Sequence, residues 1–476
     1  MVELVASAEG RCPYAEARYV RRIDEDLAVR NGAVDRAGRL VSEGIGVRVR
    51  IGGAWGFAAT PDVTRAGAER ALQRAIAIAA AQPSAPGRPR LPEPPAQGHW
   101  ESPCETDPTT LSLDTKLAPL FAADAALREH GGTQLVVTSA AATVTHLTQA
   151  FASTEGSAYT QTRTETGAGI QAIAAVAGEV QTRTYPGTHG VLVRQAGWEH
   201  VHDLDLTGHA PRVASEAIAL CTAPQCPQTT TSLVLGAEQL AYQVHESIGH
   251  ALELDRIQLG EAAYAGTSWV RTEDLGTLRY GSDQLTISAD GTIHGGLGTF
   301  GWDDEGTAGR RVLLVEDGML RSALSDRESA AVAGLPASTG CARASGFDRQ
   351  PVVRMTNVSL EPGEAGTLQD LLADTGDGIY CETNRSWSID DRRLNFQFAT
   401  EIAYEIKDGE LGRLLRNPSY HGVTPEFWAK LDAVCGPEEW SLWGVTNCGK
   451  AEPGQTMAVS HGAAPARFRD VEVGVA

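Results

Sequence analysis

Apolar and polar residues alternate along three stretches in the N-terminal part of the chain. Residues 19–30 and 45–58 have the period of two expected for half-buried β-strands, and Asn31-Gly32 between them is typical of a hairpin turn. Residues 133–185 are rich in Thr, Val and Ala and contain further period-two runs. We therefore predict antiparallel strands in this part of the chain.

A helical period replaces this alternation in three other segments. Residues 64–81 place small apolar side chains on one face and are followed by a proline. Residues 112–130 begin at Ser112, a good N-cap residue, and end at two glycines. A third helix is predicted over residues 208–221.

Two breaks divide this pattern. Residues 82–110 hold eight of the chain's 23 prolines, which predicts an extended loop or linker rather than a regular element. A second break lies at residues 221–231, where prolines flank a cysteine. We predict an α+β fold with an N-terminal α/β region, residues 1–225, and a larger, β-rich C-terminal domain, residues 226–476.

The C-terminal domain shows three more turn signals. Asp290-Gly291, Asp317-Gly318 and Asp408-Gly409 are each typical of a β-hairpin. The stretch 457–476 ends in a sequence that favours a terminal strand. No internal repeat of fixed period is evident.

Composition narrows the class of protein. The 476 residues include 40 Lys and Arg against 60 Asp and Glu, a formal net charge of -20, which argues against nucleic-acid binding. No apolar stretch approaches the roughly 20 residues of a membrane helix, and no signal peptide is visible. Eight scattered cysteines do not form a disulfide framework. We therefore expect a cytoplasmic protein that contacts neither membrane nor nucleic acid.

The segment that carries candidate chemistry is residues 236–256, an amphipathic helix with an apolar stripe. Beside that stripe lie His245, Glu246 and His250. They are similar to the HExxH helix of zinc peptidases, in which two histidines bind zinc and the glutamate activates water. The alternative interpretation is an ordinary surface helix with two unrelated histidines.

The spacing differs from HExxH by one residue. Histidines four apart on a regular helix are separated by about 40° around its axis, whereas five apart gives about 140°. His245 and His250 therefore converge only if the helix widens by one residue, as a π-bulge does, or ends just past Ile248. Gly249 is a residue type that permits either distortion.

Two histidines leave a catalytic zinc site one protein ligand short. Glu253 and Asp255 are local candidates for the third ligand. Cys448 is a remote candidate in a turn-like, glycine-containing sequence, where a thiolate would bind zinc well. These residues alone do not choose among the three.

The helix sequence HESIGHALELD, together with Asn447-Cys448-Gly449-Lys450, resembles the TldD/PmbA family of metallopeptidase-related proteins. Further similar stretches occur in the expected order along nearly the whole chain: 45–60, 300–306, 340–343 and 354–357. Within that family, TldD-type subunits carry an HExxxH helix and TldE/PmbA-type subunits lack it. This sequence resembles the TldD type.

The resemblance implies a zinc-dependent peptidase of small or unfolded peptides, such as leader segments of modified peptides. It implies that His245, His250 and Cys448 bind Zn²⁺ and that Glu246 is the general base. It also implies a dimer, either with a TldE/PmbA-like subunit or with a second copy. The HExxxH helix would then lie in the C-terminal domain, which would be the catalytic one.

Several alternatives stay open. The same chemistry could trim an aminoacyl or peptidyl natural-product intermediate, or the chain could be a non-catalytic partner subunit. Glu253 is preferred as a group behind the ligands. The acidic cluster Asp303, Asp304 and Glu305 either orders a loop near the cavity or binds a second metal. If negative charge lines the cavity, neutral or cationic peptides should enter more readily than acidic ones.

Overall fold

The computed structural model describes residues 1–82, 87–187, 190–260 and 266–475. Its helices are α1 (Val2–Ala6), α2 (Arg65–Ala81), α3 (Leu113–Gly131), α4 (Glu199–Asp203), α5 (Leu206–Thr222), α6 (Ala237–Val244), α7 (Leu254–Ile257), α8 (Arg327–Val332), α9 (Leu368–Thr375) and α10 (Thr424–Ala429). The strands that precede α6 are β1 (Tyr14–Arg30), β2 (Ala33–Ile51), β3 (Ala54–Thr60), β4 (Gln97–Glu101), β5 (Leu135–Ser153), β6 (Ala158–Val176), β7 (Glu179–Tyr185), β8 (Leu192–Gln195) and β9 (Thr229–Leu235).

The strands that follow α6 are shorter. They are β10 (Ile287–Asp290), β11 (Arg311–Glu316), β12 (Met319–Leu320), β13 (Ala342–Arg343), β14 (Val352–Val353), β15 (Asn357–Leu360), β16 (Gly378–Ile389), β17 (Asn395–Lys407), β18 (Glu410–Leu415), β19 (Pro418–Val423), β20 (Leu431–Val434), β21 (Ser441–Lys450), β22 (Gln455–Ala463) and β23 (Ala466–Val475).

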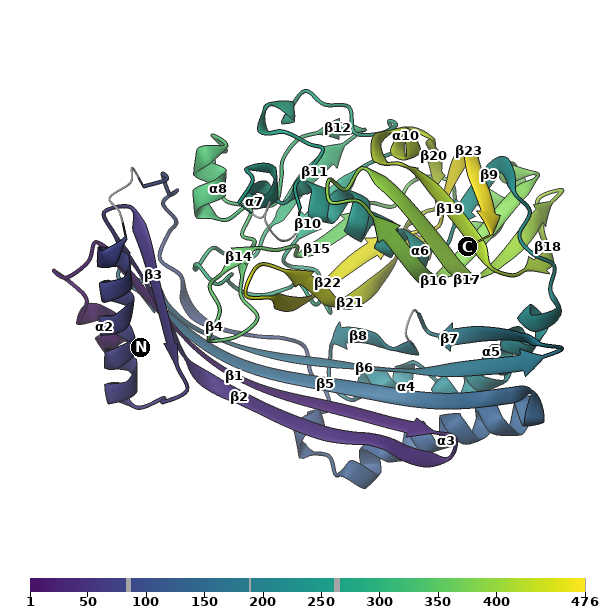
Figure 1. Ribbon diagram of the computed structural model, residues 1–476, viewed down its shortest axis with the longest axis horizontal. Coiled ribbons are helices and arrows are strands. Elements are labelled where there is room, and N and C mark those ends of the chain that lie inside the picture. Colours follow the sequence, from purple (N-terminus) through teal and green to yellow (C-terminus); the bar gives the residue numbers. More distant parts are fainter. Residues whose placement is uncertain (83–86, 188–189, 261–265, 476) are drawn as a thin grey trace.

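One long sheet dominates the N-terminal half. Its strand order is β3-β2-β1-β5-β6-β4, with β7 and β8 also paired to β6. Strands β1, β2, β5 and β6 run the length of the molecule as a gently curved platform beneath the C-terminal half (Figure 1). Helices α3 and α5 pack side by side on the face turned away from that half, and Leu27, Leu120, Ile170 and Val213 belong to the core between them and the sheet.

The C-terminal half contains two β-structures with a helix between them. Strands β16, β9, β23, β19 and β17 pair in turn, and β17 pairs back to β16, so they close into a small barrel. The second sheet has the order β12-β11-β10-β15-β22-β21. Helix α6 packs against β16 of the barrel and against β15 and β22 of the sheet. This arrangement buries α6 within the largest hydrophobic core of the chain.

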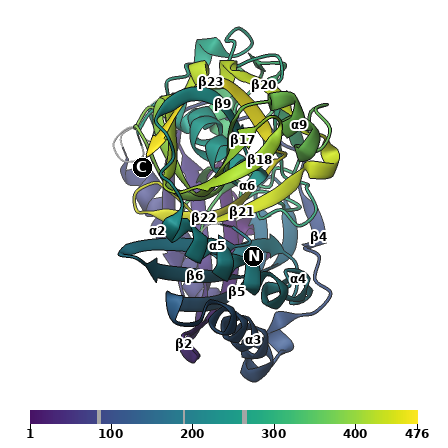
Figure 2. The ribbon, with the colours of Figure 1, turned by 90° about the vertical axis from the view of Figure 1, so that its right-hand side faces the viewer.

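Buried ion pairs hold the two halves in a set orientation. Arg48 on β2 binds Glu305 at 2.7 Å, and Arg183 on β7 binds Glu401 on β17 at 3.2 Å. Both pairs lie where the C-terminal half meets the long sheet, and an end-on view separates the two layers (Figure 2). Because these side chains are buried, breaking either pair would leave a charge buried without its partner, which is costly.

The acidic cluster at residues 303–305 orders a loop. Asp303 accepts hydrogen bonds from the backbone N–H groups of Glu305, Thr307 and Ala342. Asp304 lies 3.4 Å from the Arg18 guanidinium, and Glu305 binds Arg48. The three carboxylates face different partners, which supports the loop-ordering interpretation over a second metal site.

Most predicted elements are present. Helix α2 begins after Thr64, whose side chain accepts from Gly67 N, and α3 is capped by Ser112 as predicted. The mixed fold with a β-rich C-terminal region is confirmed. None of the described helices is long and apolar enough to cross a membrane.

Three expectations were wrong in detail. Residues 33–44 were not predicted as strand, yet β2 covers them as an exposed edge paired only with β1, where neither face requires apolar side chains. The Pro-rich stretch 82–110, of which residues 83–86 lie outside the described part, contains strand β4, paired in parallel with β6. Asp290-Gly291 is not a hairpin. The Asp290 side chain accepts from Thr292 N, and β10 pairs with the distant β11.

Candidate metal centre and the adjoining cavity

Two separate segments bring His245, His250 and Cys448 together. Both histidines follow α6, and Cys448 lies on β21, which pairs with β22 beside that helix. One ligand atom from each residue lies within 4.8 Å of the others, and Cys448 Sγ is 3.5 Å from His250 Nε2. All three side chains are buried.

The helix widens where the spacing predicted it. A π-helical turn spans His245–Gly249 and a 3₁₀ turn follows at His250–Leu252. Gly249 has φ -53° and ψ -60°, which is ordinary right-handed helix, so its conformational freedom is not what the turn uses. Glycine is required there for close approach, because Met355 packs directly against it.

His461 on β22 is the nearest neighbour of His245 that sequence reasoning missed. Its Nε2 lies 2.7 Å from His245 Nδ1, and its Nδ1 lies 2.7 Å from the carbonyl oxygen of Val358. A lone histidine in a Ser-His-Gly sequence has no partner at a recognisable spacing. Only the pairing of β22 with β15 and the packing of α6 on β22 bring it to the site.

Glu253 contacts Nδ1 of His250, as His461 contacts Nδ1 of His245. Its Oε2 lies 3.1 Å from His250 Nδ1 and 3.3 Å from Lys450 Nζ, and its side chain is fully buried. Burial alone would raise the pKa of Glu253, but Lys450 and His250 lower it well below its ordinary value. Asp255 binds the same Lys450 at 2.7 Å. Neither carboxylate belongs to the cluster of three ligand atoms.

The protonation states suit metal binding. Burial lowers the pKa of His245 to about 4 and also lowers that of His250, so both rings are neutral near pH 7. Burial by itself raises the pKa of the Cys448 thiol, but Arg354 and His250 more than offset this effect, and the net pKa falls below its ordinary value. By contrast, burial raises the pKa of Cys341 to about 12.

The donor set fits zinc. Two imidazoles and one thiolate are ligands of a catalytic zinc site, which keeps its fourth position open. Tetrahedral zinc with ordinary bond lengths separates a nitrogen and a sulfur ligand by about 3.6 Å. The observed 3.5 Å between His250 Nε2 and Cys448 Sγ agrees with that value.

Glu246 is ion-paired beside these ligands. Its Oε2 lies 2.5 Å from the Arg393 guanidinium, which belongs to the loop between β16 and β17. Both side chains are largely buried. Sequence reasoning did not identify Arg393, because an arginine in a polar loop has no signal until the barrel places that loop against the helix.

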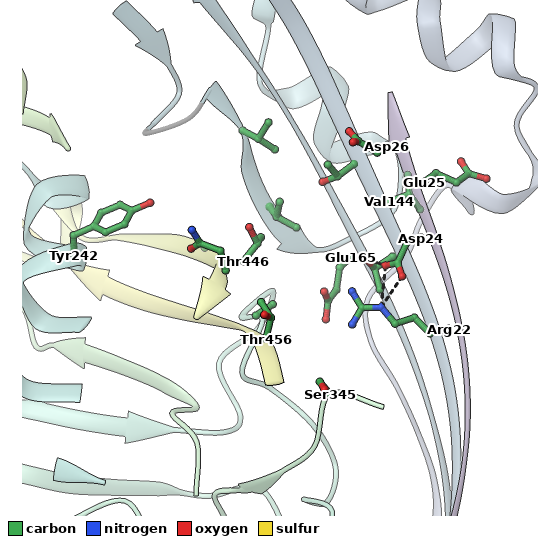
Figure 3. Close-up of a pocket in the computed structure, with 17 residues that line it drawn as sticks. Arg22, Asp24, Glu25, Asp26, Val144, Glu165, Tyr242, Ser345, Thr446 and Thr456 are labelled. Carbon is green, nitrogen blue, oxygen red and sulfur yellow. Dashed lines mark hydrogen bonds and ion pairs between the residues drawn. The ribbon is translucent and has the colours of Figure 1, made fainter. Parts of the chain in front are cut away.

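A cavity of about 650 Å³ lies between the long sheet and the C-terminal half, and the residues that line it do not include His245, His250 or Cys448 themselves. Asn447, the neighbour of Cys448, lines it together with Tyr242 on α6. Across the cavity are side chains of β1, β5 and β6, with Tyr242 and Glu165 directed into the space between the layers (Figure 3).

Carboxylates outnumber cations on the wall of this cavity. Asp24 binds the only lining cation, Arg22, at 2.8 Å, and Asp26 lies 3.3 Å from Arg36. Within the described part of the chain, Glu165 forms neither an ion pair nor a hydrogen bond. Arg22 and Arg343 interact with its charge only at a distance, so the carboxylate still adds negative charge to the cavity wall.

Three domain models of one family match the chain in order. They are PmbA/TldA metallopeptidase domain 1 over residues 15–79, the central domain over 106–220 and the C-terminal domain over 228–474. The resemblance inferred from the sequence is thereby confirmed. The division of the chain near residue 225 stays a prediction.

Individual relatives agree with this assignment. A metalloprotease of Methanothermobacter thermautotrophicus is 27% identical over 99% of this chain and 97% of that protein. A metalloprotease of Methanocaldococcus jannaschii is 32% identical, but the match covers only 56% of this chain and 55% of that protein. A 28% identical match over 51% of the chain is a zinc metalloprotease TldD homologue of Saccharolobus solfataricus.

Solved structures share the fold at low sequence identity. TldE from Thermococcus kodakarensis has a TM-score of 0.78 at 15% identity, with 99% of each chain covered. A Thermotoga maritima protein described as a proposed modulator of a DNA gyrase has a TM-score of 0.76 at 16% identity, covering 99% of this chain and 98% of its own. From the family models and the full-length relatives together, the chain belongs to the PmbA/TldD family of metallopeptidases.

Proposed function

We propose that this chain is a zinc-dependent peptidase in which His245, His250 and Cys448 hold the metal and Glu246 is the general base. The observation that carries the proposal is the convergence of the three ligand atoms, two from a widened helical turn and one from β21. A set of unrelated histidines would not need a π turn to converge. A non-catalytic subunit would not need to retain this donor set.

The chemistry follows from the neighbours of the metal ligands. Zinc held there supplies a Lewis acid for the scissile carbonyl. Glu246 would accept a proton from the attacking water and return it to the leaving amine. The ion pair with Arg393 holds the Glu246 carboxylate in a defined position, so less orientational freedom is lost when the substrate binds.

The cavity limits the substrate to a short or unfolded stretch of peptide. Its volume of about 650 Å³ lies within the range of small-ligand pockets and is far too small for a folded domain. Its acidic wall, which includes Glu165, favours neutral and basic peptides over acidic ones. The second candidate, a hydrolase of short aminoacyl or peptidyl intermediates, uses the same site and differs only in substrate length.

The proposal includes a dimer, with a TldE-like subunit or with a second copy of this chain. The similarity in fold to a TldE protein supports a pairing of two subunits of similar shape. At this low sequence identity, the similarity is evidence for the fold alone. Native mass spectrometry of the purified chain, alone and with a TldE-like protein from the same source, separates the two assemblies. A strict monomer in both samples would contradict a dimer.

Metal content per chain is the first experiment. Wild type should hold one zinc, and both His250→Ala and Cys448→Ser should lose most of it. Cys435→Ser is the matched control, because Cys435 is also a buried thiol but does not belong to the cluster. Zinc-free wild type after reconstitution would contradict the proposal. Loaded protein should then be assayed on unfolded peptides and on short acylated amino acids, which distinguishes the two substrate classes.

A further inference from the structure

His461 is buried without any charged partner among the described residues. Its exposed fraction is 0%, and its two ring nitrogens contact His245 and the Val358 carbonyl. Burying a charged imidazole without a carboxylate beside it is costly, so the ring is taken as neutral, with one nitrogen protonated and the other bare.

The Val358 carbonyl decides which nitrogen carries the proton. A carbonyl oxygen can only accept, so His461 must donate from Nδ1 at 2.7 Å. Its Nε2 is then a bare acceptor, and the 2.7 Å contact to His245 requires the proton on His245 Nδ1. That leaves the lone pair of His245 on Nε2.

The same logic applies to the other histidine with a different acceptor. The Glu253 carboxylate accepts from His250 Nδ1, which leaves the Nε2 lone pair facing Cys448 Sγ. One ligand is thus supported by a carboxylate and the other by a neutral imidazole. Metal-ligating histidines ordinarily donate their second N–H to such groups, which fixes the ring and its tautomer.

We propose that His461 is a positioning residue that fixes the tautomer of His245, so that His245 Nε2 binds the metal. The ring of His461 donates from Nδ1 to the Val358 carbonyl and accepts at Nε2 from His245 Nδ1. The inference rests on the proposed metal centre. It assigns a role to a side chain that does not itself bind the metal. These hydrogen bonds run from β15 through β22 to the widened turn after α6, so three elements together orient one metal ligand.

The direct test is nitrogen NMR on protein labelled at histidine, first without metal and then with zinc. His461 is assigned by its absence from the spectrum of His461→Gln. The expected result is a neutral His461 protonated on Nδ1 and a His245 protonated on Nδ1, with His245 Nε2 shifting on zinc addition. Protonation of His461 on Nε2 would overturn the inference.

The second readout is zinc affinity, measured by competition with a chelator. His461→Phe keeps the ring but removes the acceptor and should weaken zinc binding by about 10- to 100-fold. His461→Gln, whose amide oxygen can accept from His245, should recover part of that loss. His200→Phe is the control, because His200 is also buried and contacts a backbone carbonyl. It lies on α4, beside the core between the long sheet and helices α3 and α5, away from the metal ligands.

The two proposals can fail separately. Wild-type affinity in a folded His461→Phe variant would overturn the role of His461 while leaving the metal centre intact. A wild-type protein that binds no zinc would contradict the proposed function, whereas the tautomers of the metal-free protein would still decide the role of His461. The cobalt-substituted proteins add a spectroscopic check, because loss of His245 as a ligand changes the visible absorption bands.

Discussion

Met355 Sδ lies 2.2 Å from the position that a Cβ atom on Gly249 would occupy. Real Cβ atoms essentially never come so close to another atom, so a side chain on Gly249 would require Met355 or the turn to shift. Met355 is fully buried, which leaves it little room to move. The widened turn that carries both histidines is therefore fitted against this methionine.

Gly249→Ala should destabilise the fold by about 1–3 kcal/mol and weaken zinc binding, because either the turn or Met355 must shift. Urea unfolding and chelator competition measure the two effects. In a Met355→Ala background, Gly249→Ala should cost less stability than it does in wild type, because the obstructing side chain is gone. Gly454→Ala, with nothing near its Cβ, is the control. Additive effects of the two substitutions would refute the steric account.

Glu246→Gln should keep zinc and lose activity by about 10²- to 10⁴-fold, because the amide cannot accept the proton from water. Metal analysis and peptide turnover are measured on the same preparations. Glu238→Gln serves as control, since Glu238 is a buried glutamate on α6 outside the ligand cluster. Activity within a factor of two of wild type would assign the base to another residue.

Glu165→Gln should lower kcat/KM for a peptide rich in lysine by about three- to tenfold and leave a matched acidic peptide equal or faster. The reason is the loss of one negative charge from the cavity wall. The difference should narrow at high salt. Glu69→Gln, an exposed glutamate on α2, should change neither rate. Equal turnover of basic and acidic peptides by wild type at low salt would remove the charge preference.

Acid should weaken the contact between the two halves through Glu305. Burial alone would raise the pKa of Glu305, but Arg48 and Arg90 lower it to about 2, below the value of about 4.3 for an unfolded chain. Since the folded pKa is the lower one, this stabilisation is complete above about pH 5 and is lost as the pH falls toward 2. A depression of this size corresponds to about 3 kcal/mol.

Glu305→Gln isolates that contribution. At pH 7 the substitution should cost about 3–5 kcal/mol, because it leaves Arg48 with one buried carboxylate fewer. Between pH 5 and 2 the variant should lose less stability than wild type. Chemical denaturation at a series of pH values measures both slopes. Parallel stability curves would show that Glu305 does not titrate in this range.

Local sequence was sufficient for the elements with a strong period and a clear cap. Helices α2 and α3 were predicted, α3 with its N-cap Ser112, and the turns at Asp317-Gly318 and Asp408-Gly409 connect β11 to β12 and β17 to β18. The one-residue excess between His245 and His250 meant that convergence requires either a widened turn or an early helix end, and the widened turn is present. Each of these features depends on neighbours a few residues apart.

Features that depend on distant partners were decided by the tertiary structure. The exposed part of β2 pairs only with β1, so its sequence has no apolar period. Strand β4 follows a proline-rich stretch that favours a loop, and it forms a strand because it pairs with the edge of β6. The requirement for Gly249 comes from Met355, 106 positions away, rather than from its own backbone angles.

For the site, the sequence alone determined the residue types that can bind a metal and the irregularity needed to bring two of them together. His245, Glu246 and His250 are close in sequence, and family resemblance added Cys448. Glu253 was already preferred as a group behind the ligands, and only the tertiary structure brought in His461 and Arg393. Hydrogen bonds act over about 3 Å, and no sequence spacing encodes which buried side chains two sheets and a barrel will bring within that distance.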